Sequence, residues 1–148
     1  MLISHRGNLN GPDRRENHPD YIDEAIKLGY SVEVDLRCND GFYLGHDNSQ
    51  YEVSRGWLSD RCRHLWIHCK DISSAYIMCD SNMRYFFHVG DPFVIIAGSD
   101  NLIWCHDIAL SNTKCIIPLM GKQDLVKFTG VYYAICTDYV IYAESLLK

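Results

Sequence analysis

The feature that most constrains the fold is a seven-residue stretch in which polar and apolar side chains alternate strictly. It covers Ser31–Arg37 and reads S-V-E-V-D-L-R. A period of two is typical of a β-strand, because successive side chains point to opposite faces of a sheet. The three aliphatic residues are then expected on one face, and Glu33 and Asp35 on the other.

A strand and a helix are expected before this stretch. Leu2–Ser4 is short and apolar and leads into a loop rich in turn-forming residues. Pro19 suits the first turn of a helix, which Gly29 would end. Strand, helix and strand in this order imply parallel strands joined by a right-handed crossover. Leu65–Lys70, with sequence L-W-I-H-C-K, predicts a further strand, with Leu65, Ile67 and Cys69 on the face opposite Trp66, His68 and Lys70.

The second half of the chain is rich in short apolar segments that are separated by short connections. Strands are expected at Tyr85–His88, Phe93–Ala97, Leu102–Cys105, Cys115–Leu119 and Val131–Cys136, and helical segments at 72–78, 122–128 and 139–147. Roughly eight strands can close a barrel, but a (β/α) barrel typically needs about 250 residues. The chain has 148 residues. The expected fold is therefore α/β, a reduced TIM-like (β/α) barrel with several outer helices missing or shortened, in one domain over residues 1–148.

Composition and charge exclude several classes of protein. Hydrophobic residues make up 47% and charged residues 22%, which favours a globular domain over a disordered chain. Fourteen basic against nineteen acidic residues give a net charge of −5, which argues against a nucleic-acid partner. No apolar run is long enough for a transmembrane helix. Seven cysteines without a CxxC pair, and no signal-peptide pattern, favour free thiols and a cytoplasmic location.

Glu33 and Asp35 are the most informative polar residues. Two carboxylates on one face of a buried strand repel each other and lose hydration. A divalent cation usually relieves both costs, and oxygen ligands suit Mg²⁺ or Ca²⁺. The alternative is a sheet whose polar face is exposed to solvent, as in many antiparallel sheets.

Two histidines and an arginine give this pair a chemical context. His5 follows the strand expected at Leu2–Ser4, and His46 follows a short strand expected at Phe42–Leu44; each stands beside a turn glycine. Two histidines can act as general base and general acid, and the Arg6 guanidinium can bind a phosphate oxyanion through two hydrogen bonds. Each residue alone is more often structural. Their combination indicates phosphoryl chemistry on a small-molecule substrate.

Five short motifs follow one another over residues 3–47. They are His5-Arg6-Gly7, Glu16-Asn17, Glu33-x-Asp35, Asp40-Gly41 and His46-Asp47. In order and spacing they resemble the glycerophosphodiester phosphodiesterases, of the phosphatidylinositol-phospholipase-C-like barrel superfamily. Residues 66–70 and 135–139 are similar to the third and last strands of that family. Sphingomyelinase-D-type toxins share the same N-terminal motifs, so the resemblance does not identify the alcohol group of the substrate.

The resemblance implies hydrolysis of a glycerophosphodiester to glycerol phosphate and an alcohol. It also implies the roles of six residues: metal ligation by Glu33 and Asp35, acid and base catalysis by His5 and His46, and phosphate binding by Arg6 and Lys70. In this family an adjacent substrate hydroxyl attacks phosphorus and forms a cyclic phosphate. A phospholipase-D-like lyase that releases the cyclic phosphate is therefore an alternative.

One departure from the family concerns the metal ligands. The family usually has a third acidic ligand on its third strand, where this chain has His68. Imidazole is a poorer ligand for Mg²⁺ or Ca²⁺ and a better one for Mn²⁺ or Zn²⁺. Either the metal preference has changed, or the chain is a weak or inactive relative that binds a phosphorylated ligand.

Further polar residues lie at predicted strand ends in the second half of the chain. They are His88, Asp91, His106 and Asp107. They could line the same pocket as the family motifs. Equally, they could be ordinary polar strand termini, and the sequence leaves both interpretations open.

Overall fold

A computed structural model describes residues 1–99 and 101–148 of the chain. These residues form a mixed α/β structure with one ten-stranded sheet, five α-helices and one 3₁₀ turn. The strands are β1 (Leu2–His5), β2 (Ser31–Cys38), β3 (Phe42–Leu44), β4 (Tyr51–Val53), β5 (Leu65–Cys69), β6 (Tyr85–Phe86), β7 (Phe93–Ile95), β8 (Ile103–Cys105), β9 (Cys115–Pro118) and β10 (Ala134–Thr137). The helices are α1 (Pro19–Lys27), α2 (Arg55–Asp60), α3 (Ile72–Cys79), α4 (Lys122–Lys127) and α5 (Val140–Leu146), with the 3₁₀ turn at Ile108–Leu110.

Most of the sheet is parallel. The strands β6, β5, β2, β1, β10, β9 and β8 lie side by side in this order, each parallel to its neighbours. The predicted parallel pairing around the first helix is confirmed, with Ile3 opposite Ser31 and His5 opposite Glu33. The carboxyl ends of seven strands therefore meet at one edge of the sheet. β7 runs antiparallel to β8.

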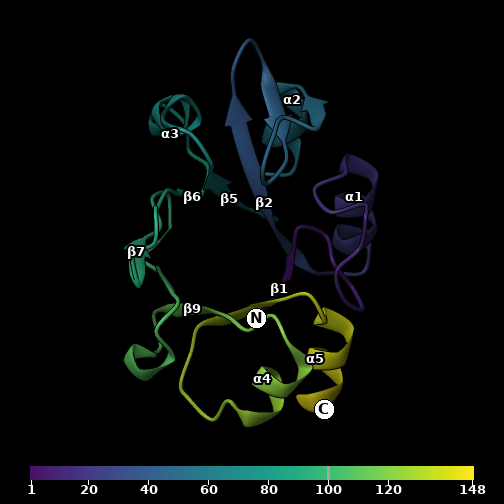
Figure 1. The fold of residues 1–148 in the computed structure, drawn as a ribbon, viewed down its shortest axis with the longest axis vertical. Coiled ribbons are helices and arrows are strands. Elements are labelled where there is room, and N and C mark those ends of the chain that lie inside the picture. Colours follow the sequence, from purple (N-terminus) through teal and green to yellow (C-terminus); the bar gives the residue numbers. More distant parts are fainter. Residues whose placement is uncertain (100) are drawn as a thin grey trace.

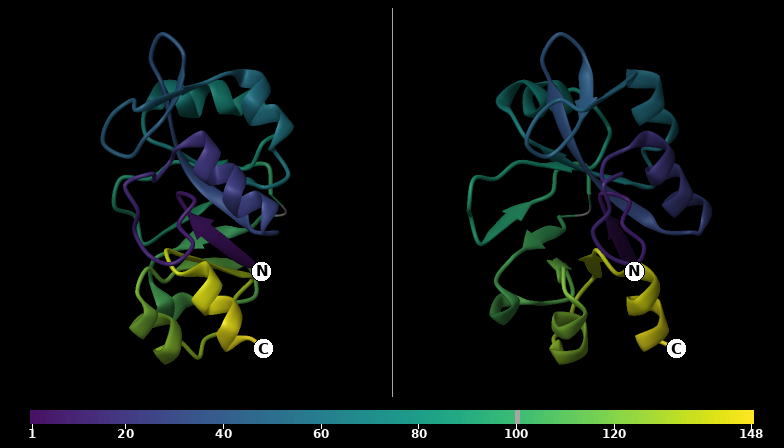
Figure 2. Two further views of the ribbon diagram at one scale, coloured as in Figure 1. Left: turned by 90° about the vertical axis from the view of Figure 1, so that its right-hand side faces the viewer. Right: turned by 45° about the vertical axis from the view of Figure 1, so that its right-hand side comes forward.

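The strands curve around the middle of the molecule, and the helices lie outside them (Figure 1). The predicted barrel is not confirmed, because β6 and β7 share no ladder and the sheet is not closed. A single antiparallel bridge between Tyr85 and Ala97 is the contact described at that point. The α-helices α1, α2 and α3 lie on one side, and α4 and α5 on another (Figure 2).

Helix α1 begins as its sequence predicts. The His18 side chain accepts a hydrogen bond from the Asp20 amide, and Pro19 occupies the first turn. The helix buries Tyr21, Ile22 and Ala25. It packs against β2, and this contact fixes the loop that carries the first polar motif.

The short elements β4 and α2 were not predicted. Their segment, residues 51–60, has too few apolar residues to show a period. β4 pairs with β3, which itself pairs with β2, and Ser54 caps α2 by accepting a hydrogen bond from the Trp57 amide. Tertiary pairing and a cap, rather than a hydrophobic pattern, define these elements.

The core has an outer and an inner part. Two outer clusters lie between the sheet and its helices, one around β2 and β5 and the other around β9 and β10. The inner cluster faces the concave side of the sheet and contains Ile3, Trp66, Phe86, Ile96, Leu102, Trp104, Ile116, Ala134 and Cys136. This cluster supports the polar residues described next.

Candidate metal and phosphate site

A layer of polar side chains lies at the carboxyl ends of the parallel strands, next to the inner cluster. Five inner residues are each followed two positions later by a histidine or a carboxylate: Ile3 by His5, Trp66 by His68, Phe86 by His88, Trp104 by His106 and Cys136 by Asp138. Alternate residues of a strand share a face, so the second residue of each pair follows the first on the concave side. The sequence pattern thus places a polar layer at the carboxyl ends of the strands, next to the apolar inner cluster.

Glu33, Asp35 and His68 come together in this layer. One ligand atom from each lies within 4.8 Å of the others. Asp35 of β2 stands directly opposite His68 of β5 in the parallel ladder. The side chains of Glu33, Asp35 and His68 are 2%, 0% and 13% exposed, so two carboxylates are buried side by side. The structure thus brings together three residues that the sequence nominated as metal ligands.

The donor atoms of this group fit a divalent cation. Oε2 of Glu33 and Oδ1 of Asp35 are buried and make no hydrogen bond among the described residues, and the nearest nitrogens of His5, His68 and Lys70 lie 3.4–3.8 Å away, at ion-pair distance. Buried carboxylate oxygens without a hydrogen bond are rare in native proteins, and a cation is a common reason for them. Two carboxylates and one imidazole form a mixed donor set that suits Mn²⁺ or Zn²⁺ better than Ca²⁺.

Asp35 is also surrounded by positive and hydrogen-bonding groups. Its Oδ2 lies 2.8 Å from Nε of Arg6 and accepts a hydrogen bond of 2.9 Å from Nδ2 of Asn17, while Nζ of Lys70 lies 3.7 Å from Oδ1. Burial alone raises the pKa of Asp35, but the His68 imidazole, whose Nδ1 lies 3.4 Å from Oδ1, and the charge of Arg6 outweigh it and hold that pKa well below its usual range. Asp35 is therefore ionised at neutral pH.

Arg6 and Asn17 reach Asp35 from unusual backbone conformations. Their φ angles are +53° and +64°, in the left-handed region that side chains other than glycine rarely adopt. The following Gly7, at φ +89°, lies so close to Tyr21 that a Cβ atom would stand 3.1 Å from its ring. Backbone strain of this kind is often found at functional sites.

His5 is held by a carboxylate that was not nominated as a site residue. Its Nδ1 lies 2.6 Å from Oδ1 of Asp138, and its Nε2 lies 3.8 Å from Oε2 of Glu33. Burial lowers the pKa of His5, but the Asp138 hydrogen bond and the Glu33 charge outweigh it and raise that pKa above its usual value. Asn8 donates a second hydrogen bond of 2.8 Å to the same Asp138 oxygen.

Glu16 completes this hydrogen-bond network. It accepts 3.0 Å and 2.8 Å bonds from Arg6 and Asn8 through its two carboxylate oxygens. Asp138 and Glu16 therefore orient the two side chains that face the metal group. The alternation from Cys136 to Asp138 at the end of β10 was the available sequence signal for Asp138.

His46 lies at the rim of the site rather than inside it. The Arg6 and Gly45 amides donate to the Glu33 and Asp35 carbonyls along one edge of β2, so the loops that carry His5 and His46 are neighbours. Among the described residues, the one carboxylate within 4 Å of the His46 ring is Asp47, at 2.7 Å.

The His46 ring is 43% exposed and borders a polar cavity of about 220 Å³ that Arg6, Glu16 and Asn17 also line. The structure thus places His46 beside Arg6 and on the solvent side of the carboxylates. Arg6 therefore borders an open polar cavity.

Of the four strand-end residues in the second half of the chain, the two histidines join the layer. The His88 ring stacks on His68 and lies next to His106. Burial, together with the charges of His68 and His106, lowers the pKa of His88 to about 4. Asp91 is exposed, and Asp107 caps the 3₁₀ turn by accepting a hydrogen bond from the Ala109 amide. Asp107 is thus a helix-capping residue, while the charge of Asp91 acts on His88 from the surface.

Comparison of the chain with family models, curated proteins and solved structures finds no match. The arguments for a function therefore come from the site itself. No helix in the described ranges is both long and apolar enough to cross a membrane.

Proposed function

We propose that this chain is a metal-dependent phosphodiesterase that acts on a glycerophosphodiester-type substrate, on a divergent, reduced (β/α) barrel. The observation that carries the proposal is the convergence of Glu33, Asp35 and His68 next to Arg6 and His5. Seven parallel strands end at this layer, as the strands of (β/α) barrels do at their active sites. The Tyr85–Ala97 bridge supports a barrel with one weak seam.

Glu33, Asp35 and His68 would hold the cation. When bound, it supplies positive charge that stabilises the additional negative charge on the phosphoryl group during the reaction. Mg²⁺ and Ca²⁺ match the two carboxylates, and the imidazole moves the preference towards Mn²⁺ or Zn²⁺. The two buried carboxylate oxygens that make no hydrogen bond are the atoms that the proposal assigns to the metal.

Arg6 and Lys70 would bind the phosphate. Both lie within 4 Å of Asp35, and their side chains are 18% and 16% exposed. They therefore border the site while remaining accessible to a ligand. Arg6 can offer a phosphate two parallel hydrogen bonds, and Lys70 a single mobile charge.

His5 and His46 would move protons. His5 is fixed by the 2.6 Å contact with Asp138, which directs its Nε2 towards Glu33 and the metal group. That position suits a base that accepts the proton of the attacking hydroxyl. His46, at the open rim, suits an acid that protonates the leaving alcohol. An adjacent hydroxyl of the substrate as nucleophile gives a cyclic phosphate first, whereas water gives the monoester directly.

A second candidate function is the binding of a phosphorylated ligand without turnover. The charges in the site favour it, because the negative charges of Glu33 and Asp35 already face Arg6, Lys70 and His68. A site that is balanced in this way can persist without a metal. His68 in place of an acidic ligand points in the same direction.

Turnover of a chromogenic phosphodiester distinguishes the two functions. The enzyme hypothesis predicts release of the alcohol with added Mn²⁺ or Mg²⁺ and loss of that activity with excess chelator. Phosphorus NMR of the products then separates a cyclic phosphate from a monoester. If glycerophosphodiesters and generic diesters both remain intact with every divalent cation while inorganic phosphate still binds, the binding function replaces the enzyme hypothesis.

A further inference from the structure

Two histidines outside the Glu33, Asp35 and His68 group direct their rings at one another. His88 follows β6 and His106 follows β8, and their Nε2 atoms lie 3.4 Å apart. Hydrogen bonds to nitrogen donors in proteins are usually shorter, about 3 Å between heavy atoms. The separation is therefore too long for a good hydrogen bond between the two rings.

The distance matches two ligands on one tetrahedral ion. Zinc–nitrogen bonds are about 2.0–2.1 Å, so two nitrogens at a tetrahedral angle lie roughly 3.3–3.4 Å apart. Neighbouring positions on a square-planar or octahedral ion would bring them to about 3 Å or less. We propose that His88 and His106 together bind one Zn²⁺ through their Nε2 atoms, as a second metal site beside the carboxylate group.

The surrounding rings hold this pair in position. The His88 ring stacks on His68 with centroids 4.8 Å apart and planes 6° apart, and it is tilted by 56° to the His106 ring at 4.9 Å. Beyond His68, the stack continues with Phe86 at 4.7 Å and from there with Trp104 at 4.5 Å. Ligands whose orientation is fixed by packing lose less entropy when they bind a metal.

The exposure of the pair leaves room for further ligands, and its donor atoms determine which ion it binds. His88 is half-buried and His106 is exposed, so water or a ligand can complete the coordination. Two neutral imidazoles suit Zn²⁺, whereas Mg²⁺ and Ca²⁺ require oxygen ligands. The second site is therefore expected to bind Zn²⁺ and to exclude Mg²⁺ and Ca²⁺.

The alternative is a direct hydrogen bond in which one ring donates through Nε2–H. The Gly90 amide lies 3.5 Å from Nδ1 of His88, beyond the usual range, so it does not fix the tautomer of that ring. The alternative predicts that neither histidine contributes to zinc binding. The zinc proposal does not rest on phosphodiesterase activity, because it requires no turnover and uses neither carboxylate.

Calorimetric titration of the full chain with Zn²⁺, in excess Mg²⁺, tests the proposal. We expect His88→Ala and His106→Ala each to lose one equivalent of bound zinc that Glu33→Gln retains. His64→Ala is the matched control, because His64 is exposed and remote from this layer in the ladder register. The seven cysteines are common to every variant, so zinc bound by thiols cancels in the comparison.

Two outcomes overturn the proposal. One is an unchanged zinc stoichiometry in both histidine variants, which leaves the hydrogen bond as the explanation. The other is loss of the same equivalent in Glu33→Gln, which would mean a single shared site. Circular dichroism verifies folding, and His106→Gln provides a second variant at an exposed position. Absence of phosphodiesterase turnover leaves the zinc result unaffected.

Discussion

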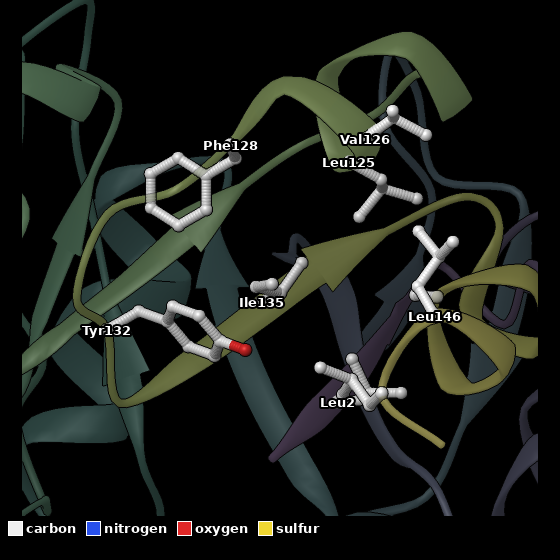
Figure 3. A pocket seen from close by; sticks show the side chains of 9 residues that line it. Leu2, Leu125, Val126, Phe128, Tyr132, Ile135 and Leu146 are labelled. Carbon is white, nitrogen blue, oxygen red and sulfur yellow. The ribbon is translucent and has the colours of Figure 1, made fainter.

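The two ends of β1 and β10 differ in chemistry although the strands are neighbours along their whole length. At the carboxyl ends, His5 and Asp138 form a 2.6 Å contact inside a polar layer. At the amino ends, Leu2 and Ile135 line an apolar cavity of about 300 Å³ (Figure 3). The carboxyl ends therefore hold buried, paired charges, while the amino ends hold mainly hydrophobic contacts.

This difference shows how the chain separates stability from function. Helices α4 and α5 cover the amino ends with apolar side chains, so burial there contributes to folding. The carboxyl ends contain buried carboxylates, which cost stability unless positive side chains or a metal compensate them. We therefore expect substitutions at the carboxyl ends to change activity and metal binding, and substitutions at the amino ends to change only the free energy of unfolding.

The largest expected effect is that of Asp35→Asn at the polar end. Removal of this carboxylate should lower turnover by about 10⁴-fold, because charge stabilisation by a metal is worth several kcal/mol. Steady-state kinetics and Mn²⁺ titration measure the loss. Asp60→Asn, at an exposed position, is the control. A folded Asp35→Asn variant with wild-type metal affinity would contradict the assignment of the site.

His46→Ala should have a smaller effect on turnover. A positioned acid or base is worth roughly 10²–10⁴-fold. Because the His46 ring is 43% exposed, we expect about 10²-fold, at the lower end of that range. The melting temperature should remain unchanged. Turnover close to that of the wild type would remove His46 from the mechanism and leave His5 as the histidine that acts.

The sequence predicted the polar end in large part. Local patterns indicate which face of its strand a side chain occupies: the alternation does so for Glu33 and Asp35, the following turn for His5, and the strand pattern for His68. One parallel ladder then brings the faces that carry Asp35 and His68 together. His46 was less predictable, since it follows a short strand whose pairing with β2 depends on tertiary contacts. Asp138 can be predicted as a partner of His5 only when β10 is known to lie beside β1.

The course of the sheet was less predictable. Barrel closure depends on how β6 and β7 meet, and the described contact there is one bridge. β6 has two residues, too few for a period to indicate its partner. The segment with β4 and α2 is fixed by pairing and capping, which leave little hydrophobic pattern. Local sequence patterns thus predicted which face of a strand each side chain occupies. The order of the strands in the sheet instead depends on contacts between distant segments.

At the apolar end, Ile135→Ala should destabilise the fold without changing metal binding. Ile135 is 6% exposed and already lines a cavity, so we expect about 2 kcal/mol, the lower limit for such truncations. Urea unfolding and Mn²⁺ titration measure the two properties. Val126→Ala, at a 60% exposed position on the same cavity, is the matched control. A change of metal affinity in Ile135→Ala would show that the two ends are coupled.

His68→Glu tests the metal preference of the polar end. A third carboxylate should strengthen Mg²⁺ binding relative to Mn²⁺ by roughly tenfold, because hard cations prefer oxygen ligands. Calorimetric titration of both variants with each ion measures the ratio. If His68 only stacks between Phe86 and His88, the substitution instead buries a charge beside Glu33 and Asp35. A lower melting temperature with unchanged selectivity would then rule out His68 as a ligand.

The smallest expected effect belongs to the Tyr30–Glu144 hydrogen bond, which ties the amino end of β2 to α5. The Tyr30 hydroxyl donates to Oε2 of Glu144 at 2.8 Å. Burial and then this hydrogen bond raise the pKa of Tyr30 to about 12, and the same bond lowers the pKa of Glu144. Tyr30→Phe should cost about 1 kcal/mol at pH 7, a usual value for one hydrogen bond, and leave metal binding unchanged.

The pH dependence of the stability difference between wild type and Tyr30→Phe follows from the pKa shifts of Tyr30 and Glu144. A raised tyrosine pKa stabilises the fold fully below the unfolded value of about 10, and this contribution is lost as the pH rises towards 12. A lowered carboxyl pKa stabilises the fold above the unfolded value of about 4.3, and this contribution is lost as the pH falls below it. The difference between wild type and Tyr30→Phe in urea unfolding should therefore be constant from about pH 5 to 9 and shrink on both sides. A difference that stays constant down to pH 3 would exclude the bond to Glu144 as its cause, because protonation of the carboxylate removes the charged acceptor.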